Sequence, residues 1–458
     1  MINFQWFFKN WTREQMQHTY LQCISCDYKT DLLEERKFRC PDCGDLYDIK
    51  HNFEPLFKST KMGFNALTLI FDERAKRSVF NPKNEATRSS GVWRFKELIM
   101  PYLDEKYIVT LGEGNVPIVR AGKHLSEWLG KDVEVWMILE GMTPTGSFKD
   151  FGGTVLMSVA KAAGIQAIAC ASTGDTSAMT AAYAAAAGIE CAVILPKGFV
   201  TSVQLAQPLA HGAKIINLPG NFDDCMRVMQ ELVRDYGVYP ANSLNPARIE
   251  GHQTTVFLTA QFFGWQLPDW FAVPVGNGSN CSSIGKALRL MESFGRGTIS
   301  KILGCQSEAA NPLAKSWATV ERGGQADPRD WKMAFRPIQV GETTATAARI
   351  GNPVSRDKVM REIFYTSGAM QIASERDLNE AVAVCGKDGY FVCPQTGIAL
   401  AGTRNAIKRG WIKKDQKVVV VSTATGLKFT DSVAAGLQNN ITDAKDCETS
   451  TVAKILRF

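Results

Sequence analysis

Short apolar runs alternate with longer helical stretches from about residue 126 onward, and this alternation is the strongest structural signal in the chain. Each run is bounded by Gly, Pro or polar residues, as buried strands are. The predicted strands are 133–138, 167–172, 191–195, 214–218, 270–275 and 417–422, and the predicted helices are 147–163, 177–187 and 223–236. Strands separated by helices predict parallel sheets covered on both faces, which bind ligands at the carboxyl ends of their strands.

The composition is that of an ordinary globular protein. The chain has 458 residues, of which 45% are hydrophobic and 21% are charged, and its Gly 38 and Pro 18 exclude collagen-like and low-complexity classes. The length allows three domains or one large α/β unit with appendages. The net charge of +6 is too mild to indicate a nucleic-acid-binding protein, although it suits a small anionic substrate.

The distribution of apolar residues predicts neither a membrane span nor a secretory signal. The longest weakly polar run is 177–195, which Gly188 and Glu190 interrupt. The first fifteen residues contain no long apolar segment and no small-residue cleavage site. We therefore expect a cytoplasmic protein with reduced cysteines and no membrane partner.

The cysteines are unevenly placed, with four of the 12 in the first 43 residues. Cys23 and Cys26 form one CxxC pair, and Cys40 and Cys43 form a second pair after 13 intervening residues. Two such pairs at this spacing are typical of a zinc ribbon, whose four-thiolate site is closed and structural. A thioredoxin-like redox pair and a metal-free knuckle are the alternatives. Cys170, Cys191 and Cys305 fall in apolar runs and are expected to be inert core residues.

Lys149 stands at the start of a predicted helix, after the turn Thr143-Pro-Thr-Gly-Ser-Phe-Lys-Asp150. The helix dipole disfavours a cation there and lowers the pKa of the amine, as a Schiff-base lysine requires. Taken alone, such a residue is more often a solvated surface lysine.

Three other turns between a strand and a helix carry polar groups. Residues 171–177 (Ala-Ser-Thr-Gly-Asp-Thr-Ser) offer hydroxyls and backbone N–H groups for a carboxylate or phosphate, or simple helix capping by Thr173 or Asp175. Residues 274–280 (Pro-Val-Gly-Asn-Gly-Ser-Asn) suit a phosphate, although they match neither a Walker loop nor GxGxxG and resemble an ordinary tight turn. Residues 422–428 (Ser-Thr-Ala-Thr-Gly-Leu-Lys) offer a hydroxyl to a heteroaromatic nitrogen, or cap a helix.

Together, these four turns supply what a pyridoxal phosphate enzyme needs. Their order resembles the fold-type II pyridoxal phosphate family, and most of all its threonine synthases of the plant-type branch, which share the Asp of the Ser-Thr-Gly-Asp-Thr-Ser loop. The resemblance covers residues from about 90 to 432 and extends to Asn242-Ser-Leu-Asn245, Arg248, Cys393-Pro, Thr396-Gly397 and Gly426-Leu-Lys-Phe429.

The resemblance implies an α/β fold like that of the tryptophan synthase β-subunit, with two three-layer α/β/α domains built on parallel sheets. We expect a Cys-rich, zinc-ribbon-like module at 1–60, a large cofactor-binding domain at 61–145 with 235–440, a smaller α/β domain at 146–234 and a tail at 441–458.

The resemblance also implies roles for individual residues. Lys149 would hold pyridoxal 5′-phosphate covalently, and the other cofactor contacts would be Phe148 at the ring, Asp175 at the 3′-oxygen, Thr423 at the pyridine nitrogen, and Gly276, Asn277, Gly278, Ser279 and Asn280 at the phosphate. The substrate carboxylate would meet Ser172, Thr173 and Thr176, and the substrate phosphate would meet Ser147, Asn242 and Arg248. Cys23, Cys26, Cys40 and Cys43 are the expected zinc ligands.

The implied reaction is γ-elimination of phosphate from O-phosphohomoserine followed by β-addition of water, which yields L-threonine, in a homodimeric enzyme. The chain departs from the family pattern at Val116, Thr143, Gln395 and Thr425, and it moves one glycine of the 276–280 turn. These departures leave two alternatives open. One is a fold-type II dehydratase or β-replacement synthase, such as a cysteate-synthase-like enzyme, acting on another amino acid. The other is a non-catalytic zinc-ribbon binding protein.

Overall fold

The computed structural model describes residues 17–60, 63–76, 85–130, 132–172, 174–197, 202–220, 222–295 and 299–437, and positions 444–445, 448–449, 452 and 455. Most of the predicted tail at 441–458 and the first part of the predicted module at 1–60 lie outside these ranges. Within the described residues, no helix is both long and apolar enough to cross a membrane.

The central sheet has six strands in the order β12-β11-β10-β13-β5-β4. Its strands are β4 (Ile118–Arg120), β5 (Glu134–Leu139), β10 (Trp270–Pro274), β11 (Lys301–Ser307), β12 (Ala369–Ala373) and β13 (Lys417–Ser422). All neighbouring strands are parallel except β4, which pairs antiparallel with β5. The prediction of purely parallel sheets is therefore wrong at this edge. β4 is too short and too polar to stand out as an apolar run in the sequence.

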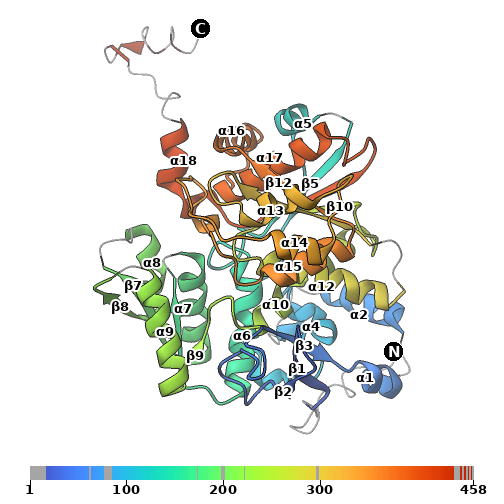
Figure 1. The fold of residues 1–458 in the computed structure, drawn as a ribbon, viewed down its shortest axis with the longest axis vertical. Helices are drawn as coiled ribbons and strands as arrows, with labels where there is room; N and C mark the ends of the chain where they lie inside the picture. The colour runs from blue at the N-terminus through green and yellow to red at the C-terminus, as the bar shows by residue number, and fades with distance from the viewer. Residues whose placement is uncertain are drawn as a thin grey trace.

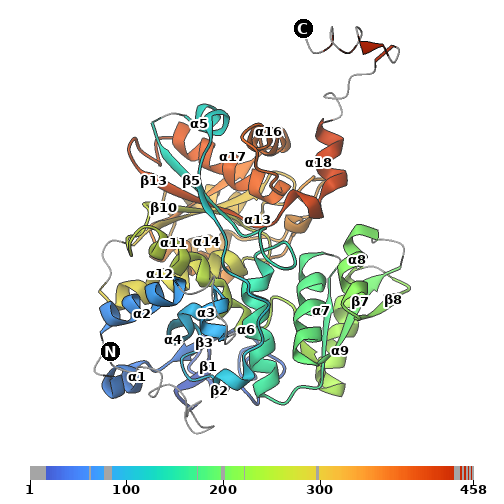
Figure 2. The ribbon, with the colours of Figure 1, turned by 180° about the vertical axis from the view of Figure 1, so that it is seen from behind.

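Helices cover both faces of the central sheet (Figures 1 and 2). One layer holds α5 (Lys123–Leu129), α16 (Glu375–Lys387) and α17 (Pro394–Lys408), and α17 packs on the four strands β10 to β13. The other layer holds α11 (Thr254–Phe262), α12 (Ser279–Ser293), α14 (Pro328–Ala334) and α15 (Arg356–Tyr365). Every residue of β10 is buried because the strand lies between these layers. Helices α13 (Pro312–Val320) and α18 (Thr430–Leu437) lie near the strand ends.

A second, smaller sheet has four parallel strands in the order β8-β7-β6-β9. Its strands are β6 (Ala167–Ala171), β7 (Glu190–Pro196), β8 (Lys214–Leu218) and β9 (Tyr239–Pro240), accompanied by α7 (Asp175–Ala187), α8 (Ser202–Ala210) and α9 (Phe222–Tyr236). Figure 1 shows this unit in green beside the larger one. The α/β fold predicted from the sequence is confirmed, whereas the predicted domain boundaries stay a prediction.

All the predicted strands and helices are present, with ends that shift by at most two residues. In the two larger sheets, the ranges of β4, β9, β11 and β12 were not predicted. Cys170, Cys191 and Cys305 are buried in β6, β7 and β11, as predicted.

Helix α6 (Lys149–Ala162) joins the two larger units, and it packs closely on α10 (Ala247–His252). Glycines make this approach possible. A Cβ added to Gly251 would lie 1.8 Å from the Phe151 carbonyl oxygen, and one added to Gly152 would lie 2.7 Å from the His252 ring. The contact fixes the N-terminus of α6, where Lys149 stands, against α10.

The N-terminal region forms a small antiparallel sheet in the order β2-β1-β3, with β1 (Thr19–Cys23), β2 (Lys29–Asp31) and β3 (Tyr47–His51). Helices α1 (Glu54–Thr60), α2 (Phe64–Lys76), α3 (Ala86–Ser89) and α4 (Lys96–Ile99) link it to the rest of the chain.

Buried ion pairs hold this small sheet to the body. Asp48 lies 2.9 Å from both Lys358 and Arg361, and Glu250 pairs with Lys286 and with His51, the latter at 3.3 Å. Although burial alone would raise the pKa of Asp48, Lys358 and Arg361 hold it well below its usual value. The carboxylate therefore stays ionised, and the pairing ties β3 firmly to α15.

Candidate active site

A cavity of about 1840 Å³ opens where the carboxyl ends of strands from both larger sheets meet. Its walls come from the turns after β5, β6, β10 and β13, from the loop after β9, and from the N-terminal module. The sequence predicts a ligand site at these strand ends, and the structure brings them to one cavity.

The turn before α6 is held by the carboxylate of Asp150. This side chain is fully buried and accepts hydrogen bonds from the backbone N of Thr145 at 2.7 Å and from its Oγ1 at 2.5 Å. Burial raises the pKa of Asp150 to about 7. These two hydrogen bonds close the turn, and the helix begins at Lys149 inside the cavity.

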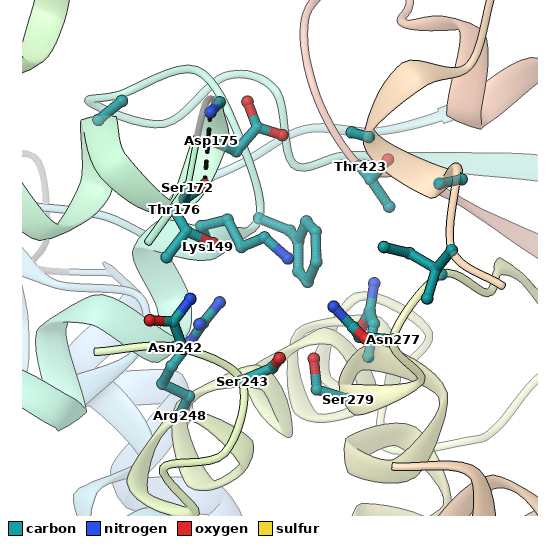
Figure 3. A pocket seen from close by; sticks show the side chains of 18 of the residues that line it. Lys149, Ser172, Asp175, Thr176, Asn242, Ser243, Arg248, Asn277, Ser279 and Thr423 are labelled. Atoms are coloured by element: carbon teal, nitrogen blue, oxygen red, sulfur yellow. Dashed lines mark hydrogen bonds between the residues drawn. The ribbon is translucent and has the colours of Figure 1, made fainter. Parts of the chain in front are cut away.

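Lys149 extends into the centre of the cavity (Figure 3). Its Nζ lies 4.0 Å from the centroid of the Phe148 ring. Burial, reinforced by the positive charge of Arg248 and opposed by Asp175, lowers the pKa of Lys149 to about 7. The low pKa predicted from the helix dipole thus has two further causes, and the amine is neutral in a large fraction of molecules at neutral pH.

Phe148 packs between Lys149 and a histidine that the sequence did not single out. The ring of His252 lies 4.9 Å from that of Phe148, centroid to centroid. His252 is fully buried, and neither ring nitrogen has a hydrogen-bond partner in the described part of the chain. Burial, with Arg248 and Lys149, holds the pKa of His252 well below its usual value, so the ring is neutral.

Asp175 is the first residue of α7 and faces the cavity from the smaller unit. Its Oδ1 lies 3.3 Å from Nζ of Lys428, which also donates to the Thr145 carbonyl at 2.8 Å. Lys428 belongs to the 3₁₀ turn Gly426–Lys428, so this pair links the two larger units across the cavity. The role of Lys428 was not predicted, although it stands in a quoted motif.

The turn between β10 and α12 forms the opposite wall, and all five predicted residues from Gly276 to Asn280 line the cavity. Gly278 has a φ of +90°, and a Cβ there would lie 2.5 Å from Val359, so only glycine fits. Asn280 is buried, and among the described residues neither its Oδ1 nor its Nδ2 has a partner. Free backbone N–H groups at the start of a long helix, beside an unpartnered amide, suit a phosphate group.

Thr423 follows β13 and faces Lys149 across the cavity. Its Oγ1 lies 3.5 Å from Sγ of Cys393, and its carbonyl accepts from the backbone N of Phe148 at 2.8 Å. The side chain of Gln395, also on the wall, is buried with both amide atoms unpartnered in the described structure. The Thr423 hydroxyl and the Gln395 amide can therefore bind a polar atom of a heteroaromatic ring.

Arg248 is the strongest candidate for binding an anion. It is fully buried at the cavity wall and donates from Nη1 to the Ala241 carbonyl at 3.0 Å. Within the described residues its Nε and Nη2 have no acceptor. Burial lowers its pKa to about 10, so the guanidinium stays charged at neutral pH. Two unused N–H groups on a buried cation call for an anionic ligand.

The other predicted substrate residues differ in where the structure places them. Ser172 and Thr176 line the cavity, and Thr173 lies outside the described residues. Asn242 also lines it, but its amide is bonded to the backbone of Ala171, at 3.1 Å to N and 2.9 Å to O.

Ser147 is fully buried and pairs with Ala424 in a β-bridge, while its neighbours Gly146 and Phe148 line the cavity. The turn places Ser147 against Ala424 and not on the cavity wall. Phosphate contacts by Ser147 and Asn242 stay a prediction.

Comparison with known proteins agrees with this geometry. The family model "Pyridoxal-phosphate dependent enzyme" matches residues 109–424. A threonine synthase of Methanocaldococcus jannaschii is 34% identical over 92% of this chain and 99% of its own length, and the chloroplastic threonine synthase 2 of Arabidopsis thaliana is 35% identical over 85% and 73%.

Solved structures show the same fold. The threonine synthase of Escherichia coli superposes with a TM-score of 0.67 at 16% identity, covering 93% of each chain. Maize serine racemase gives a TM-score of 0.57 at 16% identity over 77% of this chain and 99% of its own. The chain therefore belongs to the threonine synthases, within the fold-type II family of pyridoxal phosphate-dependent enzymes.

Proposed function

We propose that this protein is a threonine synthase that converts O-phospho-L-homoserine and water to L-threonine and phosphate. The observation that carries the proposal is a buried Arg248, with two unused N–H groups, on the wall of the cavity into which Lys149 extends. A guanidinium in this state suits a doubly charged phosphate better than an unphosphorylated amino acid. The threonine synthases among the relatives support the same substrate.

The residues of the cavity fit pyridoxal 5′-phosphate. Lys149 would hold it covalently, the 276–280 turn its phosphate, Thr423 its ring nitrogen and Asp175 its 3′-oxygen, with Phe148 near the ring. When bound, the cofactor supplies an electron sink that stabilises negative charge on the substrate carbons. The unpartnered amide of Asn280 and the glycine required at 278 are the features of this chain that match such a ligand.

The protein's own groups would then position the substrate and move its protons. Ser172 and Thr176 would bind its carboxylate, and Arg248 its phosphate. These two contacts would bring the α and β carbons near Nζ of Lys149, whose low pKa lets the neutral amine accept a proton and later return it. Lys428, 3.3 Å from Oδ1 of Asp175, would hold that carboxylate in place for the 3′-oxygen of the cofactor.

The test is an assay of the purified, cofactor-loaded protein with O-phosphohomoserine. We expect phosphate and threonine to form in equal amounts. Formation of a 2-oxo acid would indicate a dehydratase, and an absence of both phosphate release and turnover would reject the proposal.

The loading of the apoenzyme should reveal the low pKa of Lys149. Only a neutral amine attacks the cofactor aldehyde, so the rate of covalent uptake is expected to rise about tenfold per pH unit below pH 7 and to level off above it. Stopped-flow absorbance between pH 5.5 and 9.5 measures this rate. An ordinary lysine would give a rate that keeps rising toward pH 10, and that result would contradict the assignment.

We further propose that the four N-terminal cysteines hold a structural zinc ion. Their sulfur atoms all lie within 4.8 Å of one another, with Cys23 3.4 Å from Cys43 and Cys26 3.5 Å from Cys40. A four-thiolate set leaves no open position for substrate. Because thiolate ligands must stay reduced, the site favours the cytoplasm as the location. A homodimer is inferred from the family resemblance, and light scattering tests it.

Removing the zinc should destabilise the whole chain. The module shares buried ion pairs with α15 and α10, and Lys286 of α12 donates to the Ile49 carbonyl at 2.6 Å, so loosening of the module exposes Asp48 and Glu250. We expect a strong chelator, or Cys23→Ser, to lower the melting temperature by about 5 °C or more. Cys225→Ser, in the smaller unit, is the matched control. A protein purified without metal and with an unchanged melting temperature in chelator would contradict the prediction.

A further inference from the structure

We propose that the N-terminal module forms part of the wall of the active site, and that its residues Lys37 and Arg39 attract the doubly charged substrate. These two cationic residues are called the collar below. This inference rests on the proposed function. The two residues come from the segment between β2 and the second cysteine pair, yet they line the same cavity as Lys149 and Arg248.

A buried aromatic residue fixes the collar in place. Phe38 stands between Lys37 and Arg39, is fully buried, and packs edge-on against Tyr239 with ring centroids 5.4 Å apart. Tyr239 belongs to β9 and immediately precedes Pro240, which lines the cavity. Phe38 has a φ of +52°, an unusual conformation for a bulky residue, and its two chain neighbours both line the cavity.

The collar segment is also tied down at both ends. On one side, Oε1 of Glu35 accepts from the backbone N of Arg36 and Lys37 at 2.8 and 2.7 Å. On the other side, Arg39 adjoins Cys40, pairs with Leu46 in a β-bridge, and donates from Nη1 to the Gly44 carbonyl at 3.1 Å. The cysteine cluster therefore determines where the backbone of Arg39 lies.

The charge of the cavity is strongly one-sided. Asp175 is the only acidic residue among the described residues that line it, against seven basic ones: Lys37, Arg39, Lys149, Arg234, Arg248, Arg349 and Lys428. Asp175 is itself paired with Lys428, Arg234 is paired with Asp235 at 2.7 Å, and Arg349 is paired with Glu342 at 2.7 Å. The side chains of Lys37 and Arg39 are exposed, and no ion pair within the described residues neutralises them. The cavity therefore carries an excess of positive charge where a phosphorylated substrate must enter.

The double variant K37Q/R39Q tests the collar. At low salt we expect its kcat/KM for O-phosphohomoserine to fall about tenfold with kcat nearly unchanged, and the difference to shrink at high salt because the charges are screened. Inorganic phosphate should inhibit the variant correspondingly less. The matched control K29Q/K58Q removes two cations that do not line the cavity and should behave as the wild type. An unchanged melting temperature shows that the variant is folded.

The outcomes separate the collar from the proposed function. A wild-type enzyme that forms threonine, with a double variant of equal kcat/KM at low salt, would overturn the collar alone. A protein that ignores O-phosphohomoserine, but whose affinity for inorganic phosphate still depends on Lys37 and Arg39, would overturn the proposed function alone.

The link to the cysteine cluster has its own test. Cys40→Ser is expected to lower kcat/KM in the wild type, but to add little in the K37Q/R39Q background, because both changes act through the same cations. Fully additive losses would show that the cluster does not act through the collar.

Discussion

Lys149→Ala is expected to reduce threonine formation at least a thousandfold, with the melting temperature little changed. The loss combines two functions of one amine. The side chain is the only lysine that extends into the centre of the cavity among the residues labelled in Figure 3, and its pKa of about 7 suits both covalent attachment and proton transfer. Two other cations of the cavity wall do not replace it, because Arg248 stays charged and cannot act as a base, and Lys428 is paired with Asp175.

Borohydride reduction followed by mass spectrometry measures the covalent part directly. The wild-type enzyme should carry one reduced cofactor on the peptide that contains Lys149, and the variant should carry none there. Lys149→Arg keeps the charge without the nucleophile and should be as inactive as the alanine variant. Lys428→Arg, at the neighbouring lysine, should keep the covalent adduct. Appreciable threonine formation by Lys149→Ala would disprove the role of this residue.

The cofactor side of the cavity was predictable because each of its walls is a contiguous turn. The segments after β5, β6, β10 and β13 carry their Gly, Thr, Ser and Asn residues in short motifs, and a parallel sheet brings such turns together. The local patterns therefore singled out the turns that contain Lys149, Asn280 and Thr423, whereas the role of each residue came from the family resemblance.

The rest of the site depends on contacts that local patterns do not encode. Lys37 and Arg39 reach the cavity only because Phe38 packs on Tyr239, a residue far away in the chain. His252 had one available signal, its i,i+4 spacing from Arg248 on α10, which places both on one face of a helix. Ser147 stands inside a motif and yet is not among the residues that line the cavity, so its phosphate contact stays a prediction.

Arg248→Gln is expected to lower kcat/KM for O-phosphohomoserine a hundredfold or more. Truncating one partner of a buried, charge-assisted contact costs roughly 2–5 kcal/mol, which corresponds to factors of about 30 to several thousand. The fall should appear mainly in KM and in the inhibition constant of inorganic phosphate if Arg248 binds the phosphate. Arg248→Lys keeps the charge but cannot form bidentate hydrogen bonds, so its kcat/KM should lie between those of Arg248→Gln and the wild type.

The same substitution carries a second signature that a purely structural role would not produce. Because Arg248 helps to lower the pKa of Lys149, its removal should raise that pKa above about 7. The pH at which the apoenzyme takes up the cofactor at half its maximal rate should then move to a higher value. Thr259→Val, on the neighbouring helix α11, removes a buried hydrogen bond at 2.7 Å without a charge and serves as the control for loss of stability. A destabilised Arg248 variant with unchanged phosphate inhibition and an unchanged pH profile would mean that the guanidinium only supports the Ala241 carbonyl. A shift in both quantities would place the positive charge of Arg248 in contact with the substrate and beside the amine that reacts with it.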